Sequence, residues 1–267
     1  MRGLDGDHAP KASAAPAAPV PVLTAAPVLT GAPGRLVGVE LRDAVRARRM
    51  VRAYDGRPVA PRVLRELLDL AVRAPSAGGA QGRDLLVLRE PEDRARFWAA
   101  TADDVDAPDR WLAGMMTAPV LVLCLAEPGA YRRRYAEADK RTGARAADRD
   151  PDAWDVPWWD VDTGMAALLL LLGAVDAGLG ACFFGVPPGR VDAVRDAFAV
   201  PSDRRVVGAV GLGHPAPAAA AGGDRTDGRR RPRRPRRPLA EVAHEGRFGR
   251  PLDAAGTAAD GTVTAGP

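Results

Sequence analysis

The segment ARRMVRAY places Arg48, Arg49 and Arg52 close together at the end of a predicted short helix. A guanidinium group can donate two parallel hydrogen bonds to one phosphate, and arginines one and four positions apart can direct two such groups to one side. A solvated helix end gives the same pattern, because basic side chains favour helix C-termini. The segment is therefore a candidate phosphate site with a purely structural alternative.

A second candidate is RAPSAGGAQGRD, in which Pro75, Ser76 and three glycines predict a loop before a strand. Small residues let backbone amides approach a flat or anionic ligand closely. An ordinary tight connection would have the same composition. The loop matches neither GxGxxG nor a Walker motif, so the standard dinucleotide and nucleotide fingerprints are missing. A third candidate, GLGACFFGVPP, is either a ligand-contacting strand turn or a helix C-cap at Gly178 or Gly180 followed by a buried strand.

The run RRRPRRPRRP contains seven of the chain's arginines at residues 229–238. Without them the rest of the chain is net acidic, so the basic character is local. Such a run could neutralise several phosphates of a nucleic acid. However, it lies between a predicted strand and the helix-like LAEVAHEGRF, and no base-stacking aromatic residues interrupt it. We therefore do not expect nucleic-acid binding to be the main function.

Side chains for self-contained catalysis are few. The three histidines are His8, His214 and His244, and no HExxH, GxSxG or His/Cys/Asp cluster is present. We therefore expect no metal site and no catalytic side chain, and instead a cofactor that carries the chemistry. Two cysteines in apolar stretches, an apolar run about half the length of a membrane span and no export signal predict a cytoplasmic protein without a membrane partner.

These candidates need elements to position them. Sequence patterns predict helices at 39–49, 61–75, 91–102 and 186–198. Nearly continuous apolar runs predict buried strands at 84–90, 119–127 and 205–213. The span 154–180 opens with aromatic residues, offers Asp162 as an N-cap and stays apolar on every side until Gly178. Such a helix must be covered on all sides, in a core or between subunits.

The mixture of helices and strands predicts one α+β or α/β domain, although element order alone leaves the topology open. We expect a flexible Ala/Pro-rich extension at 1–36, the folded domain at 37–250 and a flexible tail at 251–267. Within the domain, 214–235 is expected to form a flexible Arg-rich connector.

Taken together and in this order, the motifs resemble the FMN-dependent nitroreductase family. The matching stretches are ARRMVRAYDGRPVAPRVLRELLDLAVRAPSAGGAQ, VDTGMAALLLLLGAVDAGLGACFFGVPP, VVGAVGLGHP and RRPLAEVAHEGRF, which span about residues 38–250. The resemblance implies an α+β sandwich with a central, mainly antiparallel sheet flanked by helices. It also implies an intertwined homodimer with FMN in two sites at the subunit interface.

The resemblance further implies which residues bind FMN. The phosphate and ribityl chain would lie on Arg48, Arg49, Met50, Val51 and Arg52, with Arg236 and Arg237 also reaching the phosphate and Arg234 as an outside candidate. Pro75, Ser76 and Gly79 would lie against the isoalloxazine ring, and Phe184 and Gly185 on its other side. Where the family usually has PSAGNxQPW, this chain has PSAGGAQGR. Because Gly79 replaces the asparagine, ring contacts have to come from the backbone or from Gln81, while Gly82 and Arg83 replace proline and tryptophan.

The resemblance implies a ping-pong reaction: NADH or NADPH gives a hydride to the flavin N5, and electrons then pass to a small nitroaromatic, quinone or enone acceptor. Oxidation of a biosynthetic intermediate, dehalogenation, a deazaflavin cofactor and a flavin-binding fold without turnover remain alternatives. The aromatic residues of 126–159 would either cover the active site or pack at the dimer interface; they are Tyr131, Tyr135, Trp154, Trp158 and Trp159.

Overall fold

The computed structural model describes residues 38–140, 150–217, 225–226, 229–230 and 235–252. Its first half contains α1 (Leu41–Ala47), α2 (Pro61–Val72), the 3-10 turn η1 (Ala77–Gly79), β1 (Arg83–Leu88), α3 (Pro91–Thr101), α4 (Arg110–Met116), β2 (Val120–Ala126) and α5 (Pro128–Tyr135). The second half contains η3 (Pro151–Ala153), α6 (Trp158–Asp176), β3 (Gly180–Phe184), η4 (Pro188–Arg190), α7 (Val191–Phe198), β4 (Arg205–Gly213), β5 (Arg225–Thr226), β6 (Arg229–Arg230) and α9 (Leu239–Val242).

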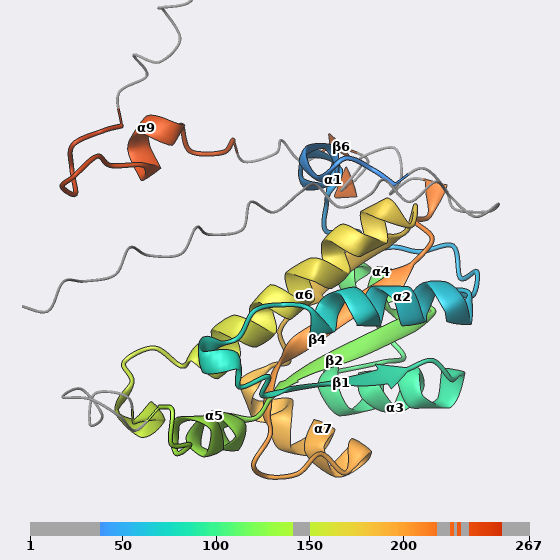
Figure 1. The fold of residues 1–267 in the computed structure, drawn as a ribbon. Helices are drawn as coiled ribbons and strands as arrows, with labels where there is room; N and C mark the ends of the chain where they lie inside the picture. The colour runs from blue at the N-terminus through green and yellow to red at the C-terminus, as the bar shows by residue number, and fades with distance from the viewer. Residues whose placement is uncertain (1–37, 141–149, 218–224, 227–228, 231–234, 253–267) are drawn as a thin grey trace, which may run out of the picture. The chain divides into compact units, whose positions relative to one another are not determined.

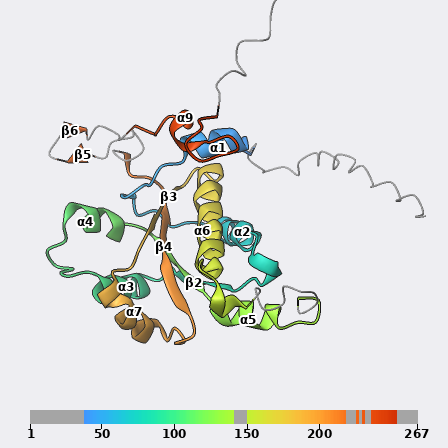
Figure 2. The ribbon, with the colours of Figure 1, turned by 90° about the vertical axis from the view of Figure 1, so that its left-hand side faces the viewer.

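The main sheet has the strand order β1-β2-β4-β3, and every pair in it is antiparallel. β2 is buried along its whole length because it lies between two other strands and under helices on both faces, whereas β1 at the edge is only partly buried. Figures 1 and 2 show α2 and α6 on one face of this sheet, with α3 and α7 on the other. The predicted fold class, helices flanking a mainly antiparallel sheet, is confirmed.

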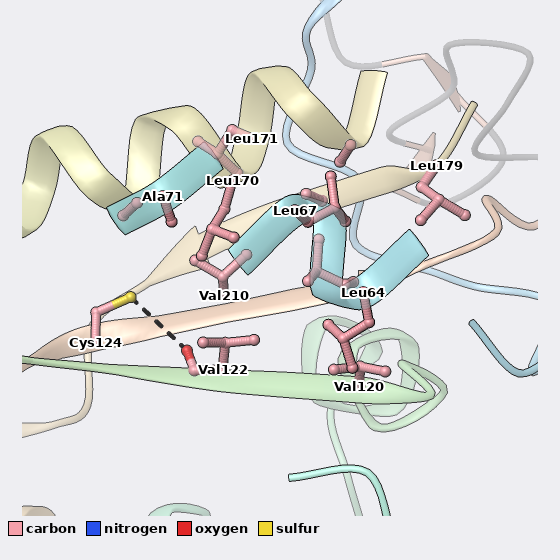
Figure 3. Packing of buried hydrophobic residues seen from close by; sticks show 14 of the residues in the cluster. Leu64, Leu67, Ala71, Val120, Val122, Cys124, Leu170, Leu171, Leu179 and Val210 are labelled. Atoms are coloured by element: carbon pink, nitrogen blue, oxygen red, sulfur yellow. Dashed lines mark hydrogen bonds between the residues drawn. The ribbon is translucent and has the colours of Figure 1, made fainter. Parts of the chain in front are cut away.

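The alternation of β2 produces two cores. Val120, Val122 and Cys124 point to the face covered by α2 and α6, while the residues between them point to the face covered by α3, α4 and α7. On the first face, Leu64, Leu67 and Ala71 of α2 lie over the sheet beside Leu170 and Leu171 of α6 (Figure 3). The apolar residues that recur with the helix period on α2 therefore pack in one layer with the residues that alternate along β2.

Helix α6 packs in this layer from Met165 on. Gly173 permits close packing, because a Cβ atom there would lie 2.9 Å from side-chain atoms of Leu67 and Leu70 in α2. By length and apolar composition alone α6 would suit a membrane span, as the core helices of globular proteins also can. In this structure its buried residues, such as Ala166 and Leu170, pack on the sheet and on α2.

One expectation about α6 was wrong. The helix begins at Trp158 with Pro157 as its N-cap, so Asp162 lies inside the helix and is not its cap. The carboxylate of Asp162 is instead buried against a loop and against α5, contacts that a local capping pattern cannot reveal.

Candidate functional site

The arginine turn, residues 48–52, runs along the outer edge of β3. Helix α1 ends at Ala47, and the N–H of Arg48 donates to the Ala44 carbonyl at 2.9 Å. Met50 then forms a parallel bridge with Ala181, whose carbonyl accepts the Val51 N–H at 2.9 Å. Gly180 allows this approach, since a Cβ atom there would lie 2.8 Å from the Val51 side chain. All five predicted phosphate and ribityl residues thus share one short segment at a sheet edge.

Arg48 offers a free donor in this turn. Its side chain is half-buried, and its Nη1 atom is buried with no hydrogen-bond partner among the described residues. A buried guanidinium nitrogen without an acceptor is costly, whereas a bound phosphate oxygen would satisfy it. The turn therefore fits an anionic ligand better than it fits the alternative of a solvated helix end.

Tyr54 holds the arginine turn against the sheet. It is part of the motif ARRMVRAY, but only residues 48–52 of that motif were predicted to have a function. Its hydroxyl lies 2.7 Å from the Val51 carbonyl oxygen and 3.0 Å from that of Gly211 in β4, and donates to this pair. Its backbone N–H donates to Thr117 Oγ1 at 2.8 Å. Burial raises the pKa of Tyr54, so the hydroxyl remains a donor at physiological pH.

The two thiols remain protonated at neutral pH. Burial raises the pKa of Cys182 in β3, and the neighbouring Arg52 guanidinium offsets only part of that effect. Burial also raises the pKa of Cys124 to about 12. Neither thiol is therefore an activated nucleophile.

The second group of predicted residues forms the PSAGG loop, residues 75–79, and the turn to Gln81. Gly78 and Gly79 have φ values of +64° and +72°, and Gln81 has a φ of +52°. Ser76 Oγ accepts the Gln81 N–H at 2.9 Å and so closes the turn. A Cβ atom at Gly79 would have no atom within 4 Å, so this side of the loop is open to a flat ligand.

Asp162 of α6 is hydrogen-bonded to this loop. Its side chain is buried, with Oδ2 accepting the Ala77 N–H at 2.8 Å and the Tyr131 hydroxyl at 2.6 Å. Arg134 of α5 makes a second contact with the loop, because its Nε–H donates to the Gly78 carbonyl at 2.8 Å. Neither contact of the loop could be predicted from the sequence, because Ala77 and Asp162 lie 85 positions apart and Gly78 and Arg134 lie 56 positions apart.

Aromatic residues line a cleft of about 660 Å³ beside the loop, together with Pro75, Ser76 and Asp162. Three of the five predicted aromatic residues contribute to it, namely Tyr135, Trp154 and Trp158. Tyr131 and Trp159 pack edge to face, with ring centroids 6.0 Å apart. The loop predicted to touch a flavin ring thus opens into an aromatic-lined cleft.

Phe184 and Gly185 lie at a different cleft, of about 330 Å³, between the end of β3 and helices α3 and α4. The Phe184 ring stacks on Trp98, with centroids 5.7 Å apart, and meets Trp111 edge to face at 5.5 Å. The side chain of Phe184 is therefore turned toward α3 and α4.

Arg236 and Arg237 are exposed in the segment 235–252. Arg237 donates to the Glu241 carboxylate at 3.2 Å and to the Glu241 carbonyl at 2.8 Å. In the described part of the chain, no hydrogen bond joins this pair to the arginine turn, and Arg234 lies outside the described residues. Their assignment to the phosphate stays a prediction.

The arginine turn and the PSAGG loop lie at opposite ends of α6. The turn is tied to β3 just after α6 ends, and the loop is tied to Asp162 near the start of the helix. Asp176 lies fourteen positions after Asp162, which is roughly 21 Å along a helix axis. In a single chain the arginine turn and the PSAGG loop are therefore far apart.

The sequence profile described as the nitroreductase family matches residues 45–214, well over half of the chain. The chain belongs to the nitroreductase family. The family predicted from the order of the motifs is thereby confirmed.

Two relatives and one solved structure illustrate this membership. A protein named NADH dehydrogenase from Thermus thermophilus is 30% identical over 67% of this chain and 88% of its own length. A proposed NADH dehydrogenase/NAD(P)H nitroreductase from Methanothermobacter thermautotrophicus is 24% identical over 68% and 81%. A family structure from Desulfovibrio desulfuricans in complex with FMN has a TM-score of 0.54 at 23% identity, over 79% of this chain and 99% of that one. This last similarity establishes the fold.

Proposed function

We propose that this protein is a flavin-dependent oxidoreductase that binds FMN and uses NAD(P)H to reduce a small organic acceptor. The observation that carries the proposal is the buried Nη1 of Arg48, which has no hydrogen-bond partner among the described residues and lies in the segment where the family's motif places the phosphate. Family membership, the relatives named as NAD(P)H nitroreductase or NADH dehydrogenase, and the FMN-bound neighbour support the same conclusion.

The chain's residues would divide the work of holding FMN. Arg48, Arg49 and Arg52 would bind the phosphate and ribityl chain, together with the backbone of Met50 and Val51. The Pro75–Ser76 segment, Gly79 and Gln81 would lie against the ring, and Phe184 and Gly185 on its other side. Bound FMN would supply the redox chemistry, receiving a hydride from NAD(P)H and returning electrons to the acceptor.

The protein would then contribute placement and exclusion of water. Backbone N–H groups of the PSAGG loop would face the place where negative charge develops on the reduced ring, apart from those of Ala77 and Gly79, which donate to Asp162 and to the Ser76 carbonyl. Trp154 and Trp158 would form an apolar wall, against which a nitroaromatic, quinone or enone acceptor stacks. Because donor and acceptor would use the same open face, the oxidised nicotinamide has to leave before the acceptor enters, which gives ping-pong kinetics.

The homodimer belongs to the same proposal. On α6, six apolar residues spaced alternately by three and four positions are exposed or only partly buried: Trp158, Val161, Met165, Leu168, Leu172 and Val175. This spacing forms a straight stripe that suits packing against a second helix. A two-fold axis across the middle of α6 would bring the arginine turn of one copy next to the PSAGG loop of the other, and so complete each site.

Titration of the apo-protein with FMN tests the proposal. Replacing Arg48 by Ala should weaken FMN binding roughly ten- to a hundredfold, because a charged hydrogen bond is worth about 1.5–3 kcal/mol. Arg46→Ala is the matched control, since Arg46 lies two residues earlier and its exposed side chain pairs with Asp43. No flavin absorbance in the purified wild-type protein, and no uptake of added FMN, would refute the proposal.

A further inference from the structure

Asp162 is a buried carboxylate at a junction of three elements. Its side chain is 2% exposed, and its carboxylate accepts hydrogen bonds from two neutral groups, the Ala77 N–H and the Tyr131 hydroxyl. Its nearest acidic neighbour on the helix, Asp160, is by contrast paired with Arg205 at 2.9 Å. A carboxylate buried to this degree depends on such hydrogen-bond donors for its stabilisation.

Both donors to Asp162 converge on one oxygen and come from other elements. The Ala77 N–H belongs to the PSAGG loop, and the Tyr131 hydroxyl belongs to α5. Burial and the hydrogen bond to Asp162 raise the pKa of Tyr131, which keeps that hydroxyl a donor. One carboxylate oxygen thus fixes the loop relative to both α5 and α6.

The position of the contact within the loop gives it a functional meaning. Ala77 lies between Ser76 and the two left-handed glycines, Gly78 and Gly79. Glycines can adopt many backbone conformations, so the loop's own sequence does not fix the direction of its N–H groups. The hydrogen bond to Asp162 supplies that constraint at the point where the loop meets the aromatic cleft.

We propose that Asp162 is a positioning residue of the flavin site, which orients the PSAGG loop by accepting the Ala77 N–H. The inference rests on the proposed function, because the loop is where the flavin ring would lie. Asp162 itself would not touch the reacting atoms. Its role would be to set the loop in the shape that receives the ring before the ring arrives.

Two substitutions and a control separate positioning from simple stability. Asp162→Ala removes the acceptor, whereas Asp162→Asn keeps an amide oxygen that can still accept both donors. Asp160→Asn removes a carboxylate from the first turn of the same helix, one that contacts Arg205 and not the loop. We expect D162A to weaken FMN binding about tenfold or more, and D162N to restore most of the affinity. D160N should bind as the wild type does.

Amide hydrogen exchange of Ala77 provides a readout without flavin. In the wild-type apo-protein this N–H should be protected, and in D162A it should exchange at least about tenfold faster, while D160N leaves it unchanged. If wild-type protein binds FMN but D162A matches D160N in affinity, the inference is wrong and the proposed function stands. An Ala77 amide that exchanges at a free-loop rate in wild-type protein would also overturn it, even if D162A does not fold. Wild-type protein that takes up no FMN would instead defeat the proposed function itself.

Discussion

Gly82 and Arg83 replace the proline and tryptophan of the usual family loop, and the structure of this chain explains both residues. A Cβ atom at Gly82 would lie 2.6 Å from both the Glu127 carbonyl oxygen and the Tyr131 ring, so neither proline nor any other side chain fits there without a shift. Arg83 folds back to α2, where its Nη2 donates to the Val72 and Ala74 carbonyls at 2.7 Å each. It thereby caps carbonyl groups that the end of a helix leaves open.

Replacing Arg83 by Ala should therefore lower the free energy of unfolding by about 1–3 kcal/mol, because two backbone acceptors lose a charged donor. Arg73→Ala is the control at the same helix end. Its guanidinium pairs with the exposed Asp69, an interaction worth about 0.5 kcal/mol or less. Urea denaturation monitored by circular dichroism measures both variants, and equal losses would show that Arg83 is not the cap.

At the scale of elements, local patterns predicted well where a signal was contained in one segment. β4 occupies the predicted range 205–213, and α2 begins at Pro61 as expected. The strand order β1-β2-β4-β3 could not be predicted, because it depends on pairing between segments far apart in sequence. The same limit explains Asp162: its type suggested a cap, and only the fold shows that its partners are Ala77 and Tyr131.

The apolar stripe of α6 makes a prediction at this scale. Leu168 lies mid-stripe and is 46% exposed in a single chain. Leu168→Glu should shift the protein from dimer to monomer and also weaken FMN binding, because a buried unpaired charge at a helix interface costs several kcal/mol. Val72→Glu is the control, since Val72 is 52% exposed on α2, outside the stripe. Size-exclusion chromatography with light scattering gives the masses, and a monomeric wild type would contradict the dimer.

At the scale of the whole molecule, the separation between the arginine turn and the PSAGG loop explains why the site could be predicted only in part. The residues of the arginine turn are consecutive, so their proximity follows from the sequence. The PSAGG loop is equally compact, but it lies roughly 20 Å away along α6, so one chain does not bring the two together. What joins them in our proposal is symmetry, which a single sequence does not display.

The last prediction concerns the arginine run of residues 229–238. Either Arg236 and Arg237 bind the FMN phosphate because of their position at the end of the run, or the whole run binds a polyanion because it contains many arginines. If Arg236 and Arg237 bind the phosphate, the double substitution Arg236→Gln/Arg237→Gln should weaken FMN binding about tenfold or more, through loss of charged phosphate contacts. Arg231→Gln/Arg233→Gln removes the same charge from the preceding part of the run and should change FMN affinity less than about threefold, because salt screens charges that do not contact the phosphate. If the whole run binds a polyanion, the two double substitutions should instead weaken binding to a DNA duplex equally and leave FMN affinity unchanged. Binding to the duplex should then depend steeply on salt. Parallel titrations with FMN and with the duplex decide between a phosphate ligand at the end of a linker and a polyanion-binding arm.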